Sequence, residues 1–77
     1  MGGGAVARML IKRSFSLAGH RTSVALELEF WDQLSRLAAV RGLTLARLVA
    51  EIDAARAPDQ PLASALRVFV VQMLTTS

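Results

Sequence analysis

Two short segments near the N-terminus alternate polar and apolar residues, but they do so out of phase. In residues 12–17 (KRSFSL) the apolar side chains fall on odd-numbered positions, and in residues 21–26 (RTSVAL) they fall mainly on even-numbered ones. A period of two is typical of a half-buried β-strand. Because a shift of one residue turns the apolar side chains of a strand to the other face, one straight strand cannot bury both sets.

The phase must therefore be reset between the segments, at Ala18-Gly19-His20, where Gly19 is the natural pivot. A hairpin loop of even length resets it, and so does a bulge at Gly19 with only the second strand paired. The sequence leaves both arrangements open. In the hairpin, the face opposite the apolar side chains is polar, basic and built of small side chains: Lys12, Ser14, Ser16, Arg21, Ser23 and Ala25.

From residue 27 onward the apolar period becomes that of amphipathic helices. Acidic residues crowd the first turns of the first predicted helix, where they suit the helix dipole, and Gly42 is placed to end it. The apolar stripe of this helix consists of Phe30, Leu34, Leu37 and Ala38. Trp31 and Phe30 are expected to anchor the core or a dimer interface.

Thr44 stands where the N-cap of a second helix belongs, and this helix is predicted to run to about Arg56. After a proline-containing loop at residues 57–61, a third helix is predicted from Leu62 to about Leu74. It is apolar nearly all round, so we expect it to be buried, at a subunit interface. Its predicted inner face consists of Leu62, Leu66, Phe69, Val70 and Met73.

The positive charge is concentrated at the N-terminal end. Residues 1–26 hold four basic residues and no acid, a charge of +4, whereas residues 27–77 hold five arginines and six acids, 5 − 6 = −1. A basic arm ahead of a nearly neutral body is typical of a protein that binds a polyanion. With 77 residues, 53% of them apolar, the chain is one small domain, and we expect a second copy to complete its core.

Several classes of protein are excluded by what the sequence lacks. With no Cys and a single His, there is no thiolate zinc set and no recognisable catalytic constellation, so we predict no enzymatic activity and no cofactor. No apolar run approaches the ~20 residues of a membrane span, and no signal peptide is visible. A cytoplasmic protein is the default expectation.

The order of a basic strand, a helix, a glycine turn and a second helix resembles the ribbon-helix-helix family of DNA-binding proteins. More specifically, the chain resembles a small bacterial subfamily of it, over roughly residues 12–71. One departure is Leu28, where a proline is expected at the first helical position. The segments that carry the resemblance include Gly19-His20-Arg21-Thr22-Ser23, Glu29-Phe30-Trp31, Arg41-Gly42-Leu43 and Leu62-Ala63-Ser64-Ala65-Leu66-Arg67.

The resemblance implies a mainly α fold with a short N-terminal β ribbon (β-α-α) plus a C-terminal third helix, in an intertwined homodimer. Residues 1–11 would be a flexible tail and residues 12–77 the folded domain. Such dimers insert an antiparallel ribbon into the major groove of double-stranded DNA, as transcriptional regulators do. The resemblance places base reading on Arg21, Ser23 and Ala25, and phosphate contacts on Lys12, Arg13 and Thr44.

Other readings of these residues stay open at this point. The chain is alternatively a dimeric protein-interaction module, antitoxin-like or an adaptor, that docks a partner through its apolar C-terminal helix. Arg21 is alternatively a structural residue paired with Glu27 or Glu29, and Thr44 a plain helix cap. The sequence identifies neither the operator nor any assembly beyond a dimer.

Overall fold

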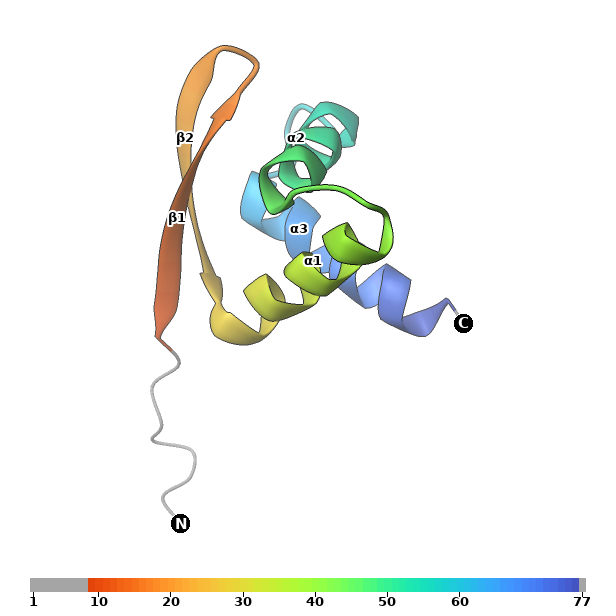
Figure 1. Cartoon of the computed structure of the whole chain (residues 1–77). Coiled ribbons are helices and arrows are strands. Elements are labelled where there is room, and N and C mark those ends of the chain that lie inside the picture. Colours follow the sequence, from red (N-terminus) through yellow and green to blue (C-terminus); the bar gives the residue numbers. More distant parts are fainter. Residues whose placement is uncertain (1–8, 77) are drawn as a thin grey trace.

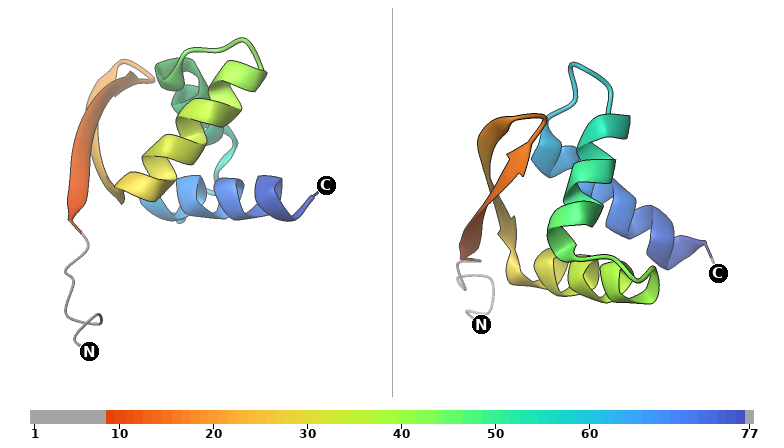
Figure 2. Two further views of the ribbon diagram at one scale, coloured as in Figure 1. Left: turned by 60° about the horizontal axis from the view of Figure 1, so that its bottom comes forward. Right: turned by 45° about the horizontal axis from the view of Figure 1, so that its top comes forward.

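The computed structural model of the protein describes residues 9–76, which form a β-hairpin and three helices. The hairpin stands to one side of the helices (Figure 1) and keeps to that side in the views of Figure 2. The elements are β1 (Leu10–Leu17), β2 (His20–Glu27), α1 (Leu28–Val40), α2 (Leu45–Ala55) and α3 (Leu62–Thr75). Strand β1 packs against α2 and also contacts Trp31 of α1, and β2 packs against α1 and α3.

A two-residue turn connects the strands. Ala18 and Gly19 both have positive φ, 51° and 82°, and the pair Leu17–His20 closes the turn. Positive φ at both central residues is typical of a type I′ turn, whose twist matches that of the flanking strands. Of the two arrangements that the sequence left open, the hairpin is therefore the one that forms.

Strand β1 begins two residues earlier than the alternation predicts. Leu10 and Ile11, which we assigned to the flexible tail, pair with Glu27 and Leu26 of β2. Ile11 is half-buried and packs against the core. Pairing with the end of β2 extends β1, and the alternation within residues 12–17 does not show this. The rest of the predicted tail, residues 1–8, lies outside the described residues.

The end of α1 follows the local signals of the sequence closely. Gly42 has a φ of 71°, and its N–H donates to the carbonyl oxygen of Ala39 at 3.0 Å. The N–H of Leu43 reaches back to the carbonyl oxygen of Ala38 at 2.8 Å. This pair of bonds is the Schellman motif, so Gly42 ends α1 as predicted.

One continuous core joins the hairpin to the helices. Trp31 is fully buried, as expected of a core anchor, whereas Phe30, which we placed in the buried stripe of α1, is half-buried. The chain thus builds a core from its own residues, and the second copy that we expected stays a prediction. The buried residues are Phe15, Leu17, Val24, Leu26, Trp31, Leu34, Ala38, Leu48, Val49, Ile52, Leu62, Ala65, Leu66 and Val70.

Helix α3 is less buried than its composition suggests. Phe69 and Met73, predicted on the inner face, are only half-buried, and Ala65 joins that face instead. The opposite side of α3 is not covered by any other element of the described chain. Three apolar side chains there are exposed, Val68 by 43%, Val71 by 52% and Leu74 by 58%.

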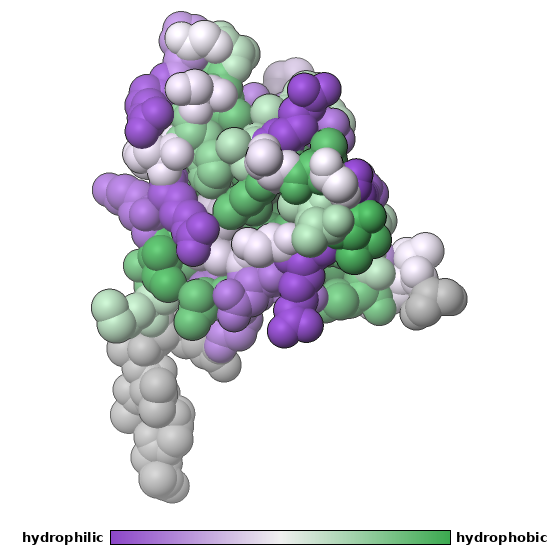
Figure 3. Space-filling model, viewed as in Figure 1, coloured by the Kyte–Doolittle hydropathy of each residue, from purple (hydrophilic) through white to green (hydrophobic). Residues whose placement is uncertain are grey.

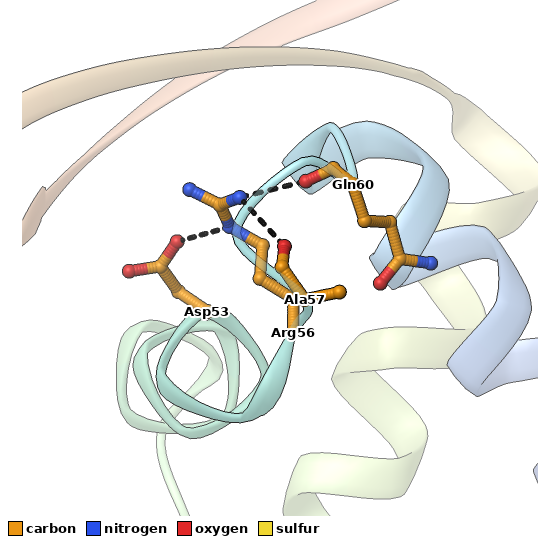
Figure 4. A network of polar contacts seen from close by, with 4 residues as sticks. All are labelled: Asp53, Arg56, Ala57 and Gln60. Carbon is orange, nitrogen blue, oxygen red and sulfur yellow. Dashed lines mark hydrogen bonds and ion pairs between the residues drawn. The ribbon is translucent and has the colours of Figure 1, made fainter.

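Arg56 fixes the loop between α2 and α3 (Figure 4). Its Nε donates to Oδ1 of Asp53 at 2.8 Å, and its Nη1 donates to the carbonyl oxygens of Gln60 at 2.6 Å and Ala57 at 3.4 Å. The Arg56 side chain is largely buried within the loop that it holds.

Candidate nucleic-acid interface

The hairpin has two chemically different faces. Its inner face carries buried apolar side chains and packs on the helices, whereas its outer face is turned to solvent. Hydrophilic residues lie along much of the hairpin in Figure 3. The register pairs Lys12 with Ala25, Ser14 with Ser23 and Ser16 with Arg21, so these six residues share one side. We call them the outer face; all are exposed except Ala25, which is half-buried.

The two cations of the outer face are available to a ligand. Within residues 9–76, neither Lys12 nor Arg21 takes part in a side-chain hydrogen bond or ion pair. Of the two partners that we considered for Arg21, Glu27 and Glu29, Glu27 accepts from Nη2 and Nε of Arg67, at 2.8 and 3.1 Å. Arg21 is therefore free to bind an external acceptor.

The serines of the outer face come from both strands. The Oγ atoms of Ser14 and Ser23 lie 2.9 Å apart, within hydrogen-bond distance, and Ser16 lies beside Arg21. Our sequence-based choice of base-reading residues took only β2 into account. The register confirms the predicted hairpin arrangement, in which Ser14 and Ser16 of β1 share this face, and the alternation of residues 12–17 is the signal that could have added them to the predicted site.

Arg13, although adjacent to Lys12 in the sequence, lies on the other side of the hairpin. It pairs with Val24, and its guanidinium carbon lies 5.2 Å from the ring centroid of Trp31. A cation over the face of an indole ring is attracted by the ring quadrupole. The structure thus does not bring the two predicted phosphate-binding cations together.

Thr44, the third predicted phosphate contact, caps α2 as expected. Its Oγ1 accepts a hydrogen bond from the backbone N–H of Arg47 at 3.1 Å, and its side chain is exposed. The first N–H groups of a helix have no partner within the helix, so they favour an anion. Thr44 belongs to the helical part of the molecule and is separate from the outer face.

A two-stranded ribbon followed by two helices and a glycine turn is the arrangement that the sequence predicted. A family model described as the ribbon-helix-helix domain matches residues 10–74. The chain belongs to the ribbon-helix-helix family. Members of this family typically bind DNA as regulators, generally as dimers, and the fold is not an enzymatic one. No curated protein and no solved structure gives a significant match to the chain.

Within the part of the chain that the structure describes, no three His, Asp or Glu side chains lie close enough together to hold a metal ion. None of the helices in residues 9–76 has the length and apolar character needed to cross a membrane.

Proposed function

We propose that the protein is a transcriptional regulator that inserts the outer face of its hairpin into the major groove of double-stranded DNA. The observation that carries the proposal is the register, which gathers two cations and three serines on the solvent side of an anchored ribbon. The major groove admits a two-stranded ribbon and displays a distinct pattern of donors and acceptors for each base pair. We propose no enzymatic role, and binding to DNA would take place in the bacterial cytoplasm.

The side chains of β2 suit different kinds of base contact. The guanidinium of Arg21 can donate to O6 and N7 of guanine at once, which discriminates between bases by about 1–3 kcal/mol. The hydroxyl of Ser23 can donate or accept, so its reading is permissive. Ala25 offers only a methyl contact, suited to thymine, and it adds little selectivity.

Three further residues are proposed to contact phosphates. Lys12 belongs to the outer face at the end of the hairpin far from the turn, and Arg13 lies on the opposite side of the hairpin, over Trp31. Thr44 opens α2, whose first N–H groups are suited to an anion. Such contacts position a protein on DNA without reading its sequence.

We propose that the protein acts as a homodimer. The family generally binds DNA in this form, and α3 leaves apolar side chains uncovered at intervals of three residues, Val68, Val71 and Leu74. A second copy that packs on this stripe would remove it from water. The same stripe supports the second candidate function, a module that docks a different protein through α3.

The decisive experiment compares two variants that lose the same charge at different places. Fluorescence anisotropy is measured with the promoter region upstream of the gene and with random duplexes, from 50 to 200 mM salt. We expect Arg21→Ala to lose the preference for its own promoter region, and Arg36→Ala, on the exposed side of α1, to bind like the parent. For the parent protein, the logarithm of the binding constant should fall linearly with the logarithm of the salt concentration. The slope should be about −0.9 for each phosphate contact.

Two results would contradict the proposal. The first is a parent protein that binds no duplex even at 50 mM salt, and that outcome would favour the protein-interaction module. The second is an Arg21→Ala variant that keeps the full preference of the parent, since base reading by Arg21 would then be wrong.

A further inference from the structure

We infer that the hollow between α2 and α3 binds a small amphipathic carboxylate, a molecule that has one carboxylate group and an apolar chain. The hollow has a volume of about 510 Å³, within the range of about 300–1,000 Å³ that is typical of small-molecule sites. Its lining comes from the helical part of the molecule and not from the hairpin, so the inference does not depend on DNA binding. Three features of the hollow point to this ligand: an apolar floor, an unpaired cation at one end, and two side-chain amides.

The floor of the hollow is apolar. Leu48 and Ile52, both buried, line it from α2, and Ala65 and Phe69 line it from α3. On α2 the lining extends from Leu48 to Ala55, nearly two turns of helix or about 10 Å. This length accommodates an alkyl chain of moderate size, and burial of such a chain against the floor is favourable.

The guanidinium of Arg41 lies at the Phe69 end of this floor. Its carbon is 5.2 Å from the centroid of the Phe69 ring, and its Nη2 lies 3.7 Å from Sδ of Met73, which is only a weak acceptor. Within residues 9–76, Arg41 forms no ion pair. A guanidinium with free N–H groups binds a carboxylate by two parallel hydrogen bonds. Arg41 therefore offers the charged end of the ligand a partner that the chain itself does not supply.

The other charged side chains of the lining already have partners. Arg56 donates to Asp53 at 2.8 Å, and Glu51 accepts from Arg47 at 3.4 Å. The hollow thus presents one unpaired positive charge, at Arg41, beside apolar surface. This combination matches a ligand with a single negative charge at one end of an apolar chain.

Two amides add polar groups to the rim. Gln60 and Gln72 both line the hollow, and neither side-chain amide forms a hydrogen bond within the described residues. In Figure 4 the side chain of Gln60 points away from Arg56, which binds only the backbone carbonyl oxygen of Gln60. Because an amide both donates and accepts, these residues can bind the carboxylate or a second polar group of the ligand.

The first experiment compares three probes by isothermal titration calorimetry on the full chain. Octanoate has both the charge and the apolar chain, octan-1-ol has the chain without the charge, and propionate has the charge with a shorter chain. We expect octanoate to bind about tenfold or more tightly than either of the others, because only octanoate both covers the floor and pairs with Arg41. The inference is overturned if octanoate does not bind, or if it binds no more tightly than octan-1-ol.

The second experiment removes one charge at two different places. Arg41→Gln should weaken octanoate binding by about tenfold or more. Arg36→Gln is the matched control, since Arg36 is exposed on α1 and does not line the hollow, and it should bind octanoate like the parent. Circular dichroism establishes that both variants are folded. Equal octanoate affinities for the two variants would contradict the role of Arg41.

The third experiment locates octanoate on the parent protein, so it does not depend on the folding of any variant. Amide chemical shifts of the ¹⁵N-labelled chain are followed during titration with octanoate. We expect shifts in the parts of α2 and α3 around Ile52 and Phe69, and unchanged amides in the hairpin. Shifts confined to the hairpin would mean that the anion binds the outer face, and shifts confined to residues 71–74 would mean that it binds the exposed side of α3. Either result would overturn the inference, whereas DNA binding, which is measured without octanoate, would be unaffected.

Discussion

The indole nitrogen of Trp31 donates a hydrogen bond to the carbonyl oxygen of Ile11 at 2.8 Å, across 20 residues of the chain. Trp31 is fully buried, and its ring packs against Phe15 with the centroids 5.8 Å apart. The bond lies at the end of β1 far from the turn, where no loop holds the two strands together. Trp31 therefore sets the position of the hairpin relative to the helices.

Replacement of Trp31 by Phe should destabilise the protein by about 1–3 kcal/mol. The change removes the donor to Ile11 and leaves part of the space of the indole ring empty. Because Trp31 is the only tryptophan, unfolding in urea is followed by circular dichroism. Arg13→Ala, which removes only the cation above the ring, should cost about 0.5–1 kcal/mol. If Trp31→Phe lowers the free energy of unfolding by no more than Arg13→Ala does, the hydrogen bond to Ile11 does not contribute to stability.

Asparagine at position 18 should stabilise the hairpin. Ala18 has a φ of 51°, a left-handed conformation that costs alanine about 1–2 kcal/mol and that asparagine tolerates better. Asn-Gly is the preferred pair for this type of turn. We expect Ala18→Asn to stabilise by about 0.5–1 kcal/mol, a rise in Tm of several degrees in calorimetry. Ala18→Val, with a β-branched side chain in the same place, should lower the Tm, and equal values for both variants would contradict the turn described.

A double-mutant cycle should detect coupling between Glu27 and Arg67, which lie 40 residues apart. Two nitrogens of Arg67 donate to one carboxylate oxygen of Glu27, at 2.8 and 3.1 Å, and the guanidinium also lies over the ring of Phe30. The two side chains are 25% and 36% exposed, so solvent weakens the interaction. We expect a coupling free energy of about 1 kcal/mol from urea unfolding of Glu27→Ala, Arg67→Ala and both. Coupling that is unchanged in 1 M salt would argue against an ion pair.

Arg56→Ala should destabilise the protein by about 1–2 kcal/mol, because it removes the donor to the carbonyl oxygen of Gln60 and to the carboxylate of Asp53. Arg47→Ala is a matched control, since Arg47 forms only an exposed i, i+4 pair with Glu51 at 3.4 Å. Such pairs contribute about 0.3–0.5 kcal/mol. Chemical denaturation of both variants measures the difference, and equal losses would mean that the loop network adds no stability.

Local signals predicted the end of α1 at Gly42 and the N-cap of α2 at Thr44. The positive φ at Gly42 and the cap at Thr44 follow from residue types whose backbone preferences hold in most contexts. The two alternating segments are out of phase, so the chain must change the phase of its alternation near Gly19. This pattern did not decide between hairpin and bulge, because that choice depends on whether β1 finds a partner, which is a long-range contact.

The features that the sequence missed depend on packing between distant segments. Burial of Trp31 was expected, but its hydrogen bond to Ile11 of β1 and the incomplete burial of Phe30 beside Arg67 were not. One side of α3 is likewise exposed because no other element of the described chain packs on it. By contrast, all six residues of the outer face were predicted from the alternation for the hairpin arrangement, and the register confirms that they share one side.

The opposing positions of the hairpin carry different side chains, Arg21 opposite Ser16 and Lys12 opposite Ala25. A ribbon made from two copies of one strand repeats its chemistry about a twofold axis, and the DNA that it prefers is then palindromic at its centre. The hairpin of a single chain has no such symmetry, so a substitution at one position of its outer face alters one edge of the hairpin and leaves the opposing edge unchanged.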